Sequence, residues 1–325
     1  MQGLLQDIKN QDFRQIYLLC GEEAYLRKQY RDRLRQALGQ EGDTMNIHYF
    51  EGKDTPVGEV IDLAETLPFF APRRVIVVEN SGWLSKGGEA LADYLSRIPE
   101  TTFLILVESQ VDKRTRLYKE MKKLGRITEF APQNEETLKR WILGMLKKEN
   151  KQITAATLQY LLNRTGTEME QIKNEMEKLL CYTLGQGEIT VEAIDAVCTR
   201  RIQNQIFDMV EAIGKKEQKQ ALTLYYDLLT LKEPPMRILA LVGRQFNYLL
   251  QIKELKSKGY SQGVMATKTG LHSFVVGKYE RQASRFKTEE LKQALAACVE
   301  ADEQVKRGLM PDVMSVELLL VQYSG

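Results

Sequence analysis

A phosphate-binding loop is the first chemistry that the residues suggest, because Gly21 follows an apolar run and precedes a helical pattern. A P-loop reads G-x-x-x-x-G-K-[ST], in which the second glycine lets backbone approach phosphate, the lysine neutralises it and the hydroxyl holds Mg²⁺. Leu26, Arg27 and Lys28 stand at those three positions here. An ordinary strand-to-helix turn is therefore favoured over residual nucleotide binding.

Two acidic residues strengthen this interpretation of the degenerate phosphate loop. Glu22 and Glu23 place negative charge at the start of the following helix, where the helix dipole would otherwise attract an anion. The loop is therefore not expected to bind nucleotide, and no cofactor is expected.

The sequence also lacks a recognisable pattern for nucleophilic catalysis or for metal binding. His48 and His272 are not accompanied by a serine or cysteine in a recognisable elbow or triad, so a structural role is favoured for both. The cysteines lie far apart, with no C-x-x-C pair and no neighbouring histidine, so no zinc site is expected. All four are predicted to be reduced and buried: Cys20, Cys181, Cys198 and Cys298.

The connection Leu67-Pro68-Phe69-Phe70-Ala71-Pro72 carries two adjacent aromatic rings between a helical pattern and an apolar strand. Each proline disfavours helix for the residue before it, so the phenylalanines occupy a short constrained connection, and connections normally lie on the surface. Burying one phenylalanine stabilises by roughly 1.5–3 kcal/mol, so two exposed rings would favour insertion into a partner pocket. The pattern leaves open whether the rings instead pack under helices of their own domain.

Two groups of basic residues are candidates for contact with DNA or with a neighbouring subunit. The segment 112–126 follows helical spacing with its cations toward solvent, and a second group falls on one side of a later helix. A solvated face is the commoner meaning of such a pattern. The first group contains Lys113, Arg114, Arg116, Lys119, Lys122, Lys123 and Arg126, and the second contains Lys278, Arg281 and Arg285.

The predicted secondary structure differs between the parts of the chain before and after Pro132. Short apolar runs alternate with helical patterns up to Pro132, and their continuous hydrophobicity predicts central parallel strands that helices cover on both faces. The predicted strands are Gln15–Cys20, Asn46–Glu51, Arg74–Glu79, Thr102–Glu108 and Arg126–Phe130.

After Pro132 the strand signals stop and amphipathic helices follow, which predicts an α/β domain plus all-α domains. A small helical domain is predicted to end near Thr199, with Thr190 capping one of its helices. A long helix is predicted from Met236 to about Lys256, after two prolines that the first helical turn tolerates.

Composition excludes several classes of protein. The 325 residues are 43% hydrophobic and 28% charged, which is typical of a globular protein with two or three domains. The net charge of +2 gives no general attraction to nucleic acid, so basic contacts would have to be local. No secretory signal or membrane-spanning run is found, which predicts a cytoplasmic protein without membrane contact.

Several short motifs, taken in order, resemble those of the delta subunits of bacterial clamp loaders, part of DNA polymerase III. The segment from Leu67 to Val78 resembles the clamp-binding motif of that family, a hydrophobic pair followed by small residues and a basic position. One departure is Phe69, where some members carry leucine. The other similar motifs are Gly21-Glu22-Glu23 with Tyr25-Leu26, Asn174-Glu175 with Glu177-Lys178-Leu179, Ile189-Thr190, Arg244-Gln245-Phe246, His272-Ser273-Phe274, Gln282-Ala283, and Ala301-Asp302 with Lys306 and Gly308.

The resemblance implies three domains. They are an AAA+-like (RecA-like) parallel-sheet domain over 1–134, a small helical lid domain over 135–202 and a helical collar domain over 203–325. The collar would pack with the ATPase and delta-prime subunits of a clamp loader.

The resemblance also implies a function. Leu67, Phe69 and Phe70 would bind the sliding clamp, the beta subunit, and help to open it for loading onto primed DNA. The chain itself would be non-catalytic, within an assembly that has DNA-directed DNA polymerase activity. Two alternatives stay open, namely an active AAA+ ATPase and a helical nucleic-acid-binding adaptor.

Overall fold

The computed structural model describes most of the chain, in four ranges: 1–39, 42–198, 202–271 and 273–325. The predicted domain end near Thr199 and the role of His272 lie outside these residues. Two compact units are found, Met1–Gln133 and Asn134–Gly325. The further division of the second unit into lid and collar, with a boundary at residue 202, stays a prediction.

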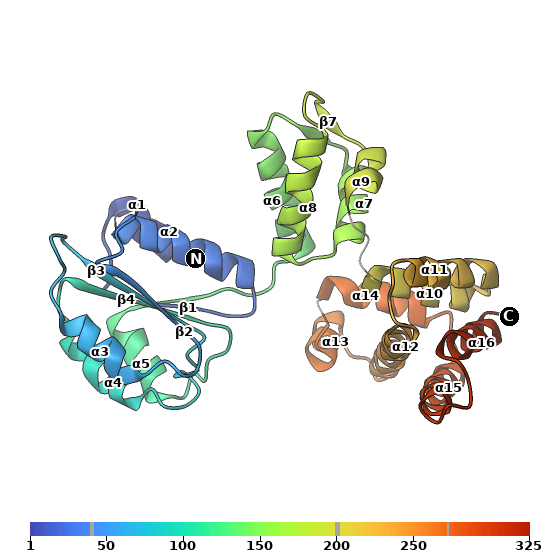
Figure 1. The fold of residues 1–325 in the computed structure, drawn as a ribbon. Coiled ribbons are helices and arrows are strands. Elements are labelled where there is room, and N and C mark those ends of the chain that lie inside the picture. The colour runs from blue at the N-terminus through green and yellow to red at the C-terminus, as the bar shows by residue number, and fades with distance from the viewer. Residues whose placement is uncertain (40–41, 199–201, 272) are drawn as a thin grey trace. The chain divides into compact units, whose positions relative to one another are not determined.

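The first unit is built on a five-stranded parallel sheet with the order β2-β3-β4-β1-β5 (Figure 1). Each predicted strand is confirmed to within one residue at either end. The strands are β1 (Ile16–Cys20), β2 (Ile47–Glu51), β3 (Arg74–Glu79), β4 (Thr102–Glu108) and β5 (Arg126–Glu129).

Helices cover both faces of this sheet, as the continuous apolar strands require. In Figure 1, α1 and α2 lie on one face and α3, α4 and α5 on the other. Alternate strand residues such as Ile76 and Leu104 are buried against the second group. The helices are α1 (Gln2–Asn10), α2 (Ala24–Leu38), α3 (Val57–Glu65), α4 (Glu89–Tyr94) with the 3₁₀ turn η1 (Leu95–Arg97), and α5 (Arg116–Leu124).

The order of the strands reverses between β1 and β4. Ligands of open parallel sheets bind beyond the carboxyl ends of the strands at such a switch point. The structure therefore places the segment after Cys20 and the end of β4, at Glu108, where a nucleotide would be expected in a functional site.

The second unit starts with four helices and a small ladder of two parallel strands. The ladder, β6 (Gln152–Ile153) with β7 (Glu188–Ile189), corrects the prediction that strands end before this unit. Two residues per strand are too few to produce a hydrophobic period, so no pattern could reveal them. The predicted cap is confirmed, because the Thr190 hydroxyl accepts from the Ala193 N–H at 3.3 Å. The helices are α6 (Glu135–Lys148), α7 (Ala155–Thr165), α8 (Met169–Tyr182) and α9 (Val191–Val197).

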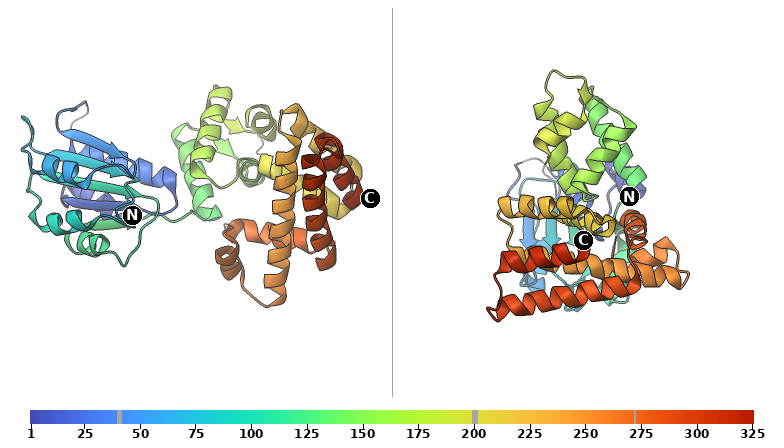
Figure 2. Two further views of the ribbon diagram at one scale, coloured as in Figure 1. Left: turned by 60° about the horizontal axis from the view of Figure 1, so that its bottom comes forward. Right: turned by 90° about the vertical axis from the view of Figure 1, so that its right-hand side faces the viewer.

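The remainder of the second unit is a bundle of helices around α12 (Pro235–Ser257), which confirms the predicted long helix. It packs against α10, α14 and α15, and the gold-to-red helices of Figure 2 lie side by side in both views. Leu239, Val242 and Phe246 of α12 are buried in the common core. The other helices are α10 (Ile202–Lys215), α11 (Gln218–Thr230), α13 (Gln262–Thr269), α14 (Ser273–Ala283), α15 (Thr288–Lys306) and α16 (Asp312–Ser324).

The cysteine prediction is correct for three residues and wrong for Cys181, which is exposed on α8. The buried stripe of that helix runs through Met176 and Leu179, and Cys181 falls beside it on the solvent side. None of the helices in the described ranges combines the length and hydropathy that a bilayer span requires.

Candidate functional site

The connection between α3 and β3 presents three large apolar side chains to solvent. Leu67 is 79% exposed, Phe69 56% and Phe70 95%. The two phenylalanine rings pack edge to face, with centroids 4.7 Å apart and planes at 83°. The open question of ring burial is therefore answered, since both residues are mainly exposed to solvent. Contiguous exposed apolar side chains are typical of a surface that binds a partner.

Buried Asn46 holds the backbone of this loop from the side of β2. Its Oδ1 accepts from the Phe69 N–H at 2.6 Å, and its Nδ2 donates to the Phe69 carbonyl oxygen at 3.0 Å. The same Nδ2 donates to the Asp43 carboxylate at 2.9 Å. Bonds from Asn46 are the main cause that lowers the pKa of Asp43. Both backbone polar groups of Phe69 are thus satisfied although its ring is exposed.

Arg74, the first residue of β3, holds the other side of the loop. It is 6% exposed, and its guanidinium donates to the Thr66 carbonyl at 3.1 Å and to the Leu67 carbonyl at 2.7 Å. Its Nη1 lies 2.9 Å from Nε2 of His48 on β2. His48 therefore has a structural contact, in line with the role that the sequence favoured. A planar cation with several donors suits this task because it can satisfy diverging carbonyls at once.

Phe70 has an unusual backbone conformation. Its φ of 48° lies in the left-handed region, which is a genuine outlier for a bulky residue without glycine's freedom. Such a conformation costs about 1–2 kcal/mol and persists only where surrounding bonds determine it. Here the neighbouring bonds of Phe69 and Leu67 do so, and the outcome is a ring that points into solvent.

The second candidate region is the carboxyl edge of the sheet, where a nucleotide would bind. Because the strands are parallel, their last residues share this edge. Four of the five strands end in glutamate and β1 ends in Cys20. The glutamates are Glu51, Glu79, Glu108 and Glu129.

Most of these carboxylates already have partners within the chain. Glu79 forms an ion pair with Arg31 of α2, and Glu129 pairs with Lys113 at 2.8 Å. Buried Glu108 accepts from the Ser81 hydroxyl at 2.5 Å and from the Ser81 N–H at 2.9 Å. Burial raises the pKa of Glu108, and burial also raises the pKa of Cys20 to about 11. The edge is therefore acidic, and intramolecular bonds occupy it.

The degenerate phosphate loop itself adopts a compact turn at this edge. Gly21 has φ 115°, and a side chain there would collide with the Phe130 carbonyl oxygen, which explains the glycine without a phosphate. That oxygen also accepts from the Glu23 N–H at 3.1 Å. Glu23 caps α2 by accepting from the Tyr25 N–H. A carboxylate thus stands at the helix start where an anion would otherwise sit.

The three residues at altered P-loop positions belong to α2 and face different surroundings. Leu26 is buried in the core, Arg27 is partly buried and Lys28 is exposed.

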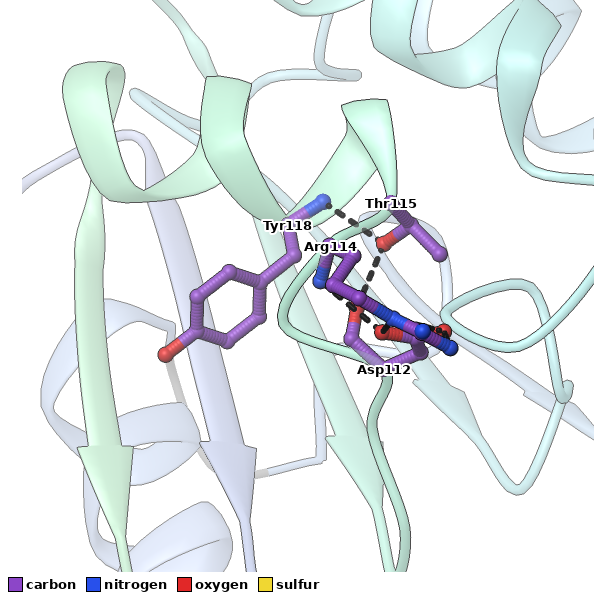
Figure 3. Close-up of polar contacts among 4 residues, drawn as sticks. All are labelled: Asp112, Arg114, Thr115 and Tyr118. Carbon is purple, nitrogen blue, oxygen red and sulfur yellow. Dashed lines mark hydrogen bonds and ion pairs between the residues drawn. The ribbon is translucent and has the colours of Figure 1, made fainter.

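The first basic group divides into paired and unpaired cations. Arg114 pairs with Asp112 at 2.8 Å, and Figure 3 shows this pair beside Thr115, which caps α5 through the Tyr118 N–H. Arg114 lowers the pKa of Asp112 to about 2. Lys113 and Arg116 pair with Glu129 and Asp93 at 2.8 and 2.5 Å. Among the described residues no ion pair is found for the exposed Lys119, Lys122 and Lys123.

The inclusion of Arg126 in that solvent-facing group was wrong. Arg126 begins β5, and its Nη2 donates to buried Asp7 of α1 at 2.8 Å. The helical period of the segment ends at Leu124, so Arg126 belongs to the next element and has a structural partner.

The second basic group lies around a cavity of about 820 Å³ within the second unit. Lys278, Arg281 and Arg285 all line it. Lys278 donates to the Asn163 side chain at 2.7 Å, and burial lowers the pKa of Lys278. Arg285 lies 3.4 Å from the Glu211 carboxylate. Arg281 donates from Nε to the Gly277 carbonyl oxygen at 3.4 Å. All three cations are thus engaged within the chain.

Asn46 and Arg74 hold the loop from the starts of β2 and β3, and neither was predicted from the sequence as a functional candidate. Asn46 lies 23 residues before Phe69, and no spacing rule connects the start of one strand to a loop beyond the next helix. A polar residue at the edge of an apolar run was the sole available signal. Among the described residues, no group of three His, Cys, Asp or Glu side chains could hold a metal ion.

Two family models match the chain. The model described as DNA polymerase III, delta subunit matches residues 17–131, and the model described as DNA polymerase III delta subunit, C-terminal domain matches residues 203–323. The first match lies in the first unit and the second match in the second unit, and together they cover more than half of the chain.

Individual relatives extend the similarity to nearly the full length. DNA polymerase III subunit delta of Bacillus subtilis (strain 168) is 29% identical over 331 residues, covering 98% of this chain and 95% of that protein. The probable DNA polymerase III subunit delta of Aquifex aeolicus (strain VF5) is 23% identical over 301 residues, covering 88% and 85%. A solved structure of the Bacillus subtilis DNA clamp loader delta protein has a TM-score of 0.76 and 27% identity, with 99% of each chain covered.

Proposed function

The chain belongs to the family of DNA polymerase III delta subunits, the clamp loader subunits of DNA replication, and on that premise we propose that its loop 66–73 binds the sliding clamp. The observation that carries the proposal is the exposure of Phe69 and Phe70 on a loop whose backbone is held by buried side chains. Leu67 adds a third apolar contact beside them.

The loop offers enough energy for such a contact. Full burial of two phenylalanines stabilises by about 3–6 kcal/mol, and interface energy concentrates in a few aromatic anchors. In the proposed mechanism, ATP bound by neighbouring subunits frees this chain. Its aromatic pair then enters an apolar pocket of the clamp, and the binding energy offsets the opening of one interface of the ring.

The chain contributes binding rather than catalysis in this proposal. The carboxyl edge of the sheet supports this, because the Glu23 carboxylate lies at the start of α2, where a phosphate would bind. Two cations near this edge, Arg31 and Lys113, are already paired with Glu79 and Glu129. ATP would then be bound and hydrolysed by partner subunits. The DNA polymerase activity likewise belongs to the assembly and not to this chain.

The helical bundle from residue 203 is proposed to contact the ATPase and delta-prime subunits. Its last helix, α16, supports this with an exposed apolar face on an element that is otherwise packed into the bundle. Primed DNA would be met within the assembly, and a replication subunit of this kind would act in the cytoplasm. The exposed apolar residues of α16 are Val313, Met314, Leu318 and Val321.

Surface plasmon resonance with the cognate sliding clamp immobilised tests the proposal. Saturable binding of the isolated chain, without ATP, is the expected result. ATP hydrolysis by the isolated chain with no clamp binding would instead favour the ATPase alternative. Tight DNA binding without clamp or loader subunits, falling steeply with salt, would favour the adaptor alternative.

A further inference from the structure

We propose that Asn46 is a positioning residue for clamp binding, which holds the backbone of Phe69 so that the aromatic pair protrudes before the partner arrives. This inference rests on the proposed function and deepens it. It assigns a role to Asn46, which lies just before β2. Asn46 is only 3% exposed, so its own side chain presents almost no surface to a partner.

The hydrogen bonds of Asn46 fix its orientation. Its oxygen accepts the Phe69 N–H at 2.6 Å, and its nitrogen donates both to the Phe69 carbonyl at 3.0 Å and to Asp43 at 2.9 Å. A flipped amide would direct its NH₂ group at the Phe69 N–H and its oxygen at two acceptors, so one orientation satisfies all groups. Asp43 accepts further bonds from the backbone N–H groups of Met45 and Asn46. The chain of bonds therefore runs from the turn before β2 directly to the loop.

The hydrogen bonds of the Asn46 side chain to Phe69 stabilise the loop rather than the core of the domain. Phe69 is 56% exposed and Phe70 is 95% exposed, so their rings gain little from the folded chain itself. Without a brace, apolar rings next to an apolar domain would be free to fold back, and the left-handed φ of Phe70 would relax. Ordering a loop during association lowers affinity, whereas a loop that is ordered in advance avoids that entropy cost.

Arg74 braces the preceding residues in the same way, but it is a less specific probe. It is itself a strand residue within the sheet and contacts His48 as well as the loop. A change at Arg74 would therefore disturb folding and binding together. Asn46 precedes its strand, and its side chain bonds reach the loop and the Asp43 turn alone among the described contacts.

A double-mutant cycle separates positioning from a merely structural role. Asn46→Ala is expected to weaken clamp binding about tenfold, since two hydrogen bonds of ordinary net strength are lost. In the background of Phe69→Ala with Phe70→Ala it is expected to change affinity less than about twofold, because the residues it positions are gone. Amide hydrogen exchange of the free chain should show faster exchange at Phe69 in Asn46→Ala.

Two further variants make the experiment decisive. Thr115→Ala removes a helix cap in the same unit, and it should lower stability without changing clamp affinity. Asp43→Asn is the milder variant for the case that Asn46→Ala does not fold. It weakens the anchor of the Asn46 amide at a residue that is only partly buried, and it is expected to lower affinity about threefold.

The outcomes distinguish this inference from the proposed function. If the wild-type chain does not bind the clamp, the proposed function fails and the docking role of Asn46 fails with it. If the wild-type chain binds and Asn46→Ala binds equally well, the positioning role alone is wrong. Equal losses in the wild-type and alanine-pair backgrounds would likewise assign Asn46 to general stability.

Discussion

The carboxyl edge of the sheet and the loop 66–73 lie in the same unit and differ in what they leave unsatisfied. At the edge, polar and charged groups are bonded within the chain, Arg31 to Glu79 and Glu108 to Ser81. In the loop, the backbone polar groups are bonded, but the apolar rings of Phe69 and Phe70 stay in water. Internal bonds thus satisfy the polar groups of the edge, whereas the apolar surface of the loop stays exposed to solvent.

The two regions differ in how the parallel sheet uses the residues at the ends of its strands. Substitution at three P-loop positions removes the contacts of phosphate, and the glutamates with their basic partners then stabilise the fold locally. The parallel sheet also fixes where β2 and β3 begin. Asn46 and Arg74 stand at those two starts and define the position of the loop.

The double variant Phe69→Ala with Phe70→Ala tests the proposed role of the loop most directly. We expect clamp affinity to fall by about 100-fold or more, about 3 kcal/mol, because both anchors of the proposed interface are lost. Unfolding free energy should change by less than about 0.5 kcal/mol, since the rings are exposed. Surface plasmon resonance and urea titration measure the two quantities.

Phe69→Leu is the matched control for the alanine pair. A leucine retains an apolar side chain of similar reach, so most of the affinity should remain. Unchanged affinity in the alanine pair would move the proposed interface away from the loop.

The edge is expected to show the opposite behaviour, with an effect on stability and none on binding. Arg31→Ala leaves Glu79 without its partner in a partly buried pair, and the unfolding free energy should fall by about 2 kcal/mol. Lys28→Ala, an exposed change on the same helix, should stay within about 0.5 kcal/mol. Urea titration of both variants gives these values. A loss of clamp affinity in Arg31→Ala would mean that the two regions are coupled.

Sequence patterns predicted the sheet well because its evidence is local. Runs such as Val75–Val78 are continuously apolar, and their short length together with their β-branched residues favours buried strands over helices. The loop was also predicted as a constrained connection, because Pro68 and Pro72 act on their direct neighbours.

The exposure of the rings and the brace behind them could not be predicted in this way. Exposure depends on whether the surrounding helices leave room for the rings, which is set by packing between elements. The bonds of Asn46 and Arg74 join residues that are distant in the sequence or belong to different elements. The prediction that Cys181 is buried was wrong for a related reason. A small residue at the border of a helical stripe fits either the buried or the exposed face, so the pattern does not decide between them.

The basic residues around α5 allow a test of whether this helix contacts primed DNA. If this helix meets the phosphates of primed DNA, changing Lys119, Lys122 and Lys123 to glutamine should lower the slope of log affinity against log salt by about 3 in the assembled loader. The same change at Lys113, Arg114 and Arg116 should lower it by about 1 or less, because acids already neutralise these cations. Fluorescence anisotropy with primed DNA measures the slope. Equal slopes for all three proteins would assign the group to a solvated face.

The smallest expected effect concerns Cys20, which reports whether the carboxyl edge of the sheet is closed. One thiol per folded chain, that of exposed Cys181, should react rapidly with a disulfide reagent at pH 8. Burial raises the pKa of Cys20 to about 11 and that of Cys198 and Cys298 to about 12, so about one in a thousand or fewer of these thiols is ionised at that pH. Cys181→Ser should abolish the rapid phase and leave clamp binding unchanged. A rapid phase that persists in Cys181→Ser and disappears when Cys20 is also replaced would show that the edge opens to solvent, so that its internal bonds no longer distinguish it from an accessible site.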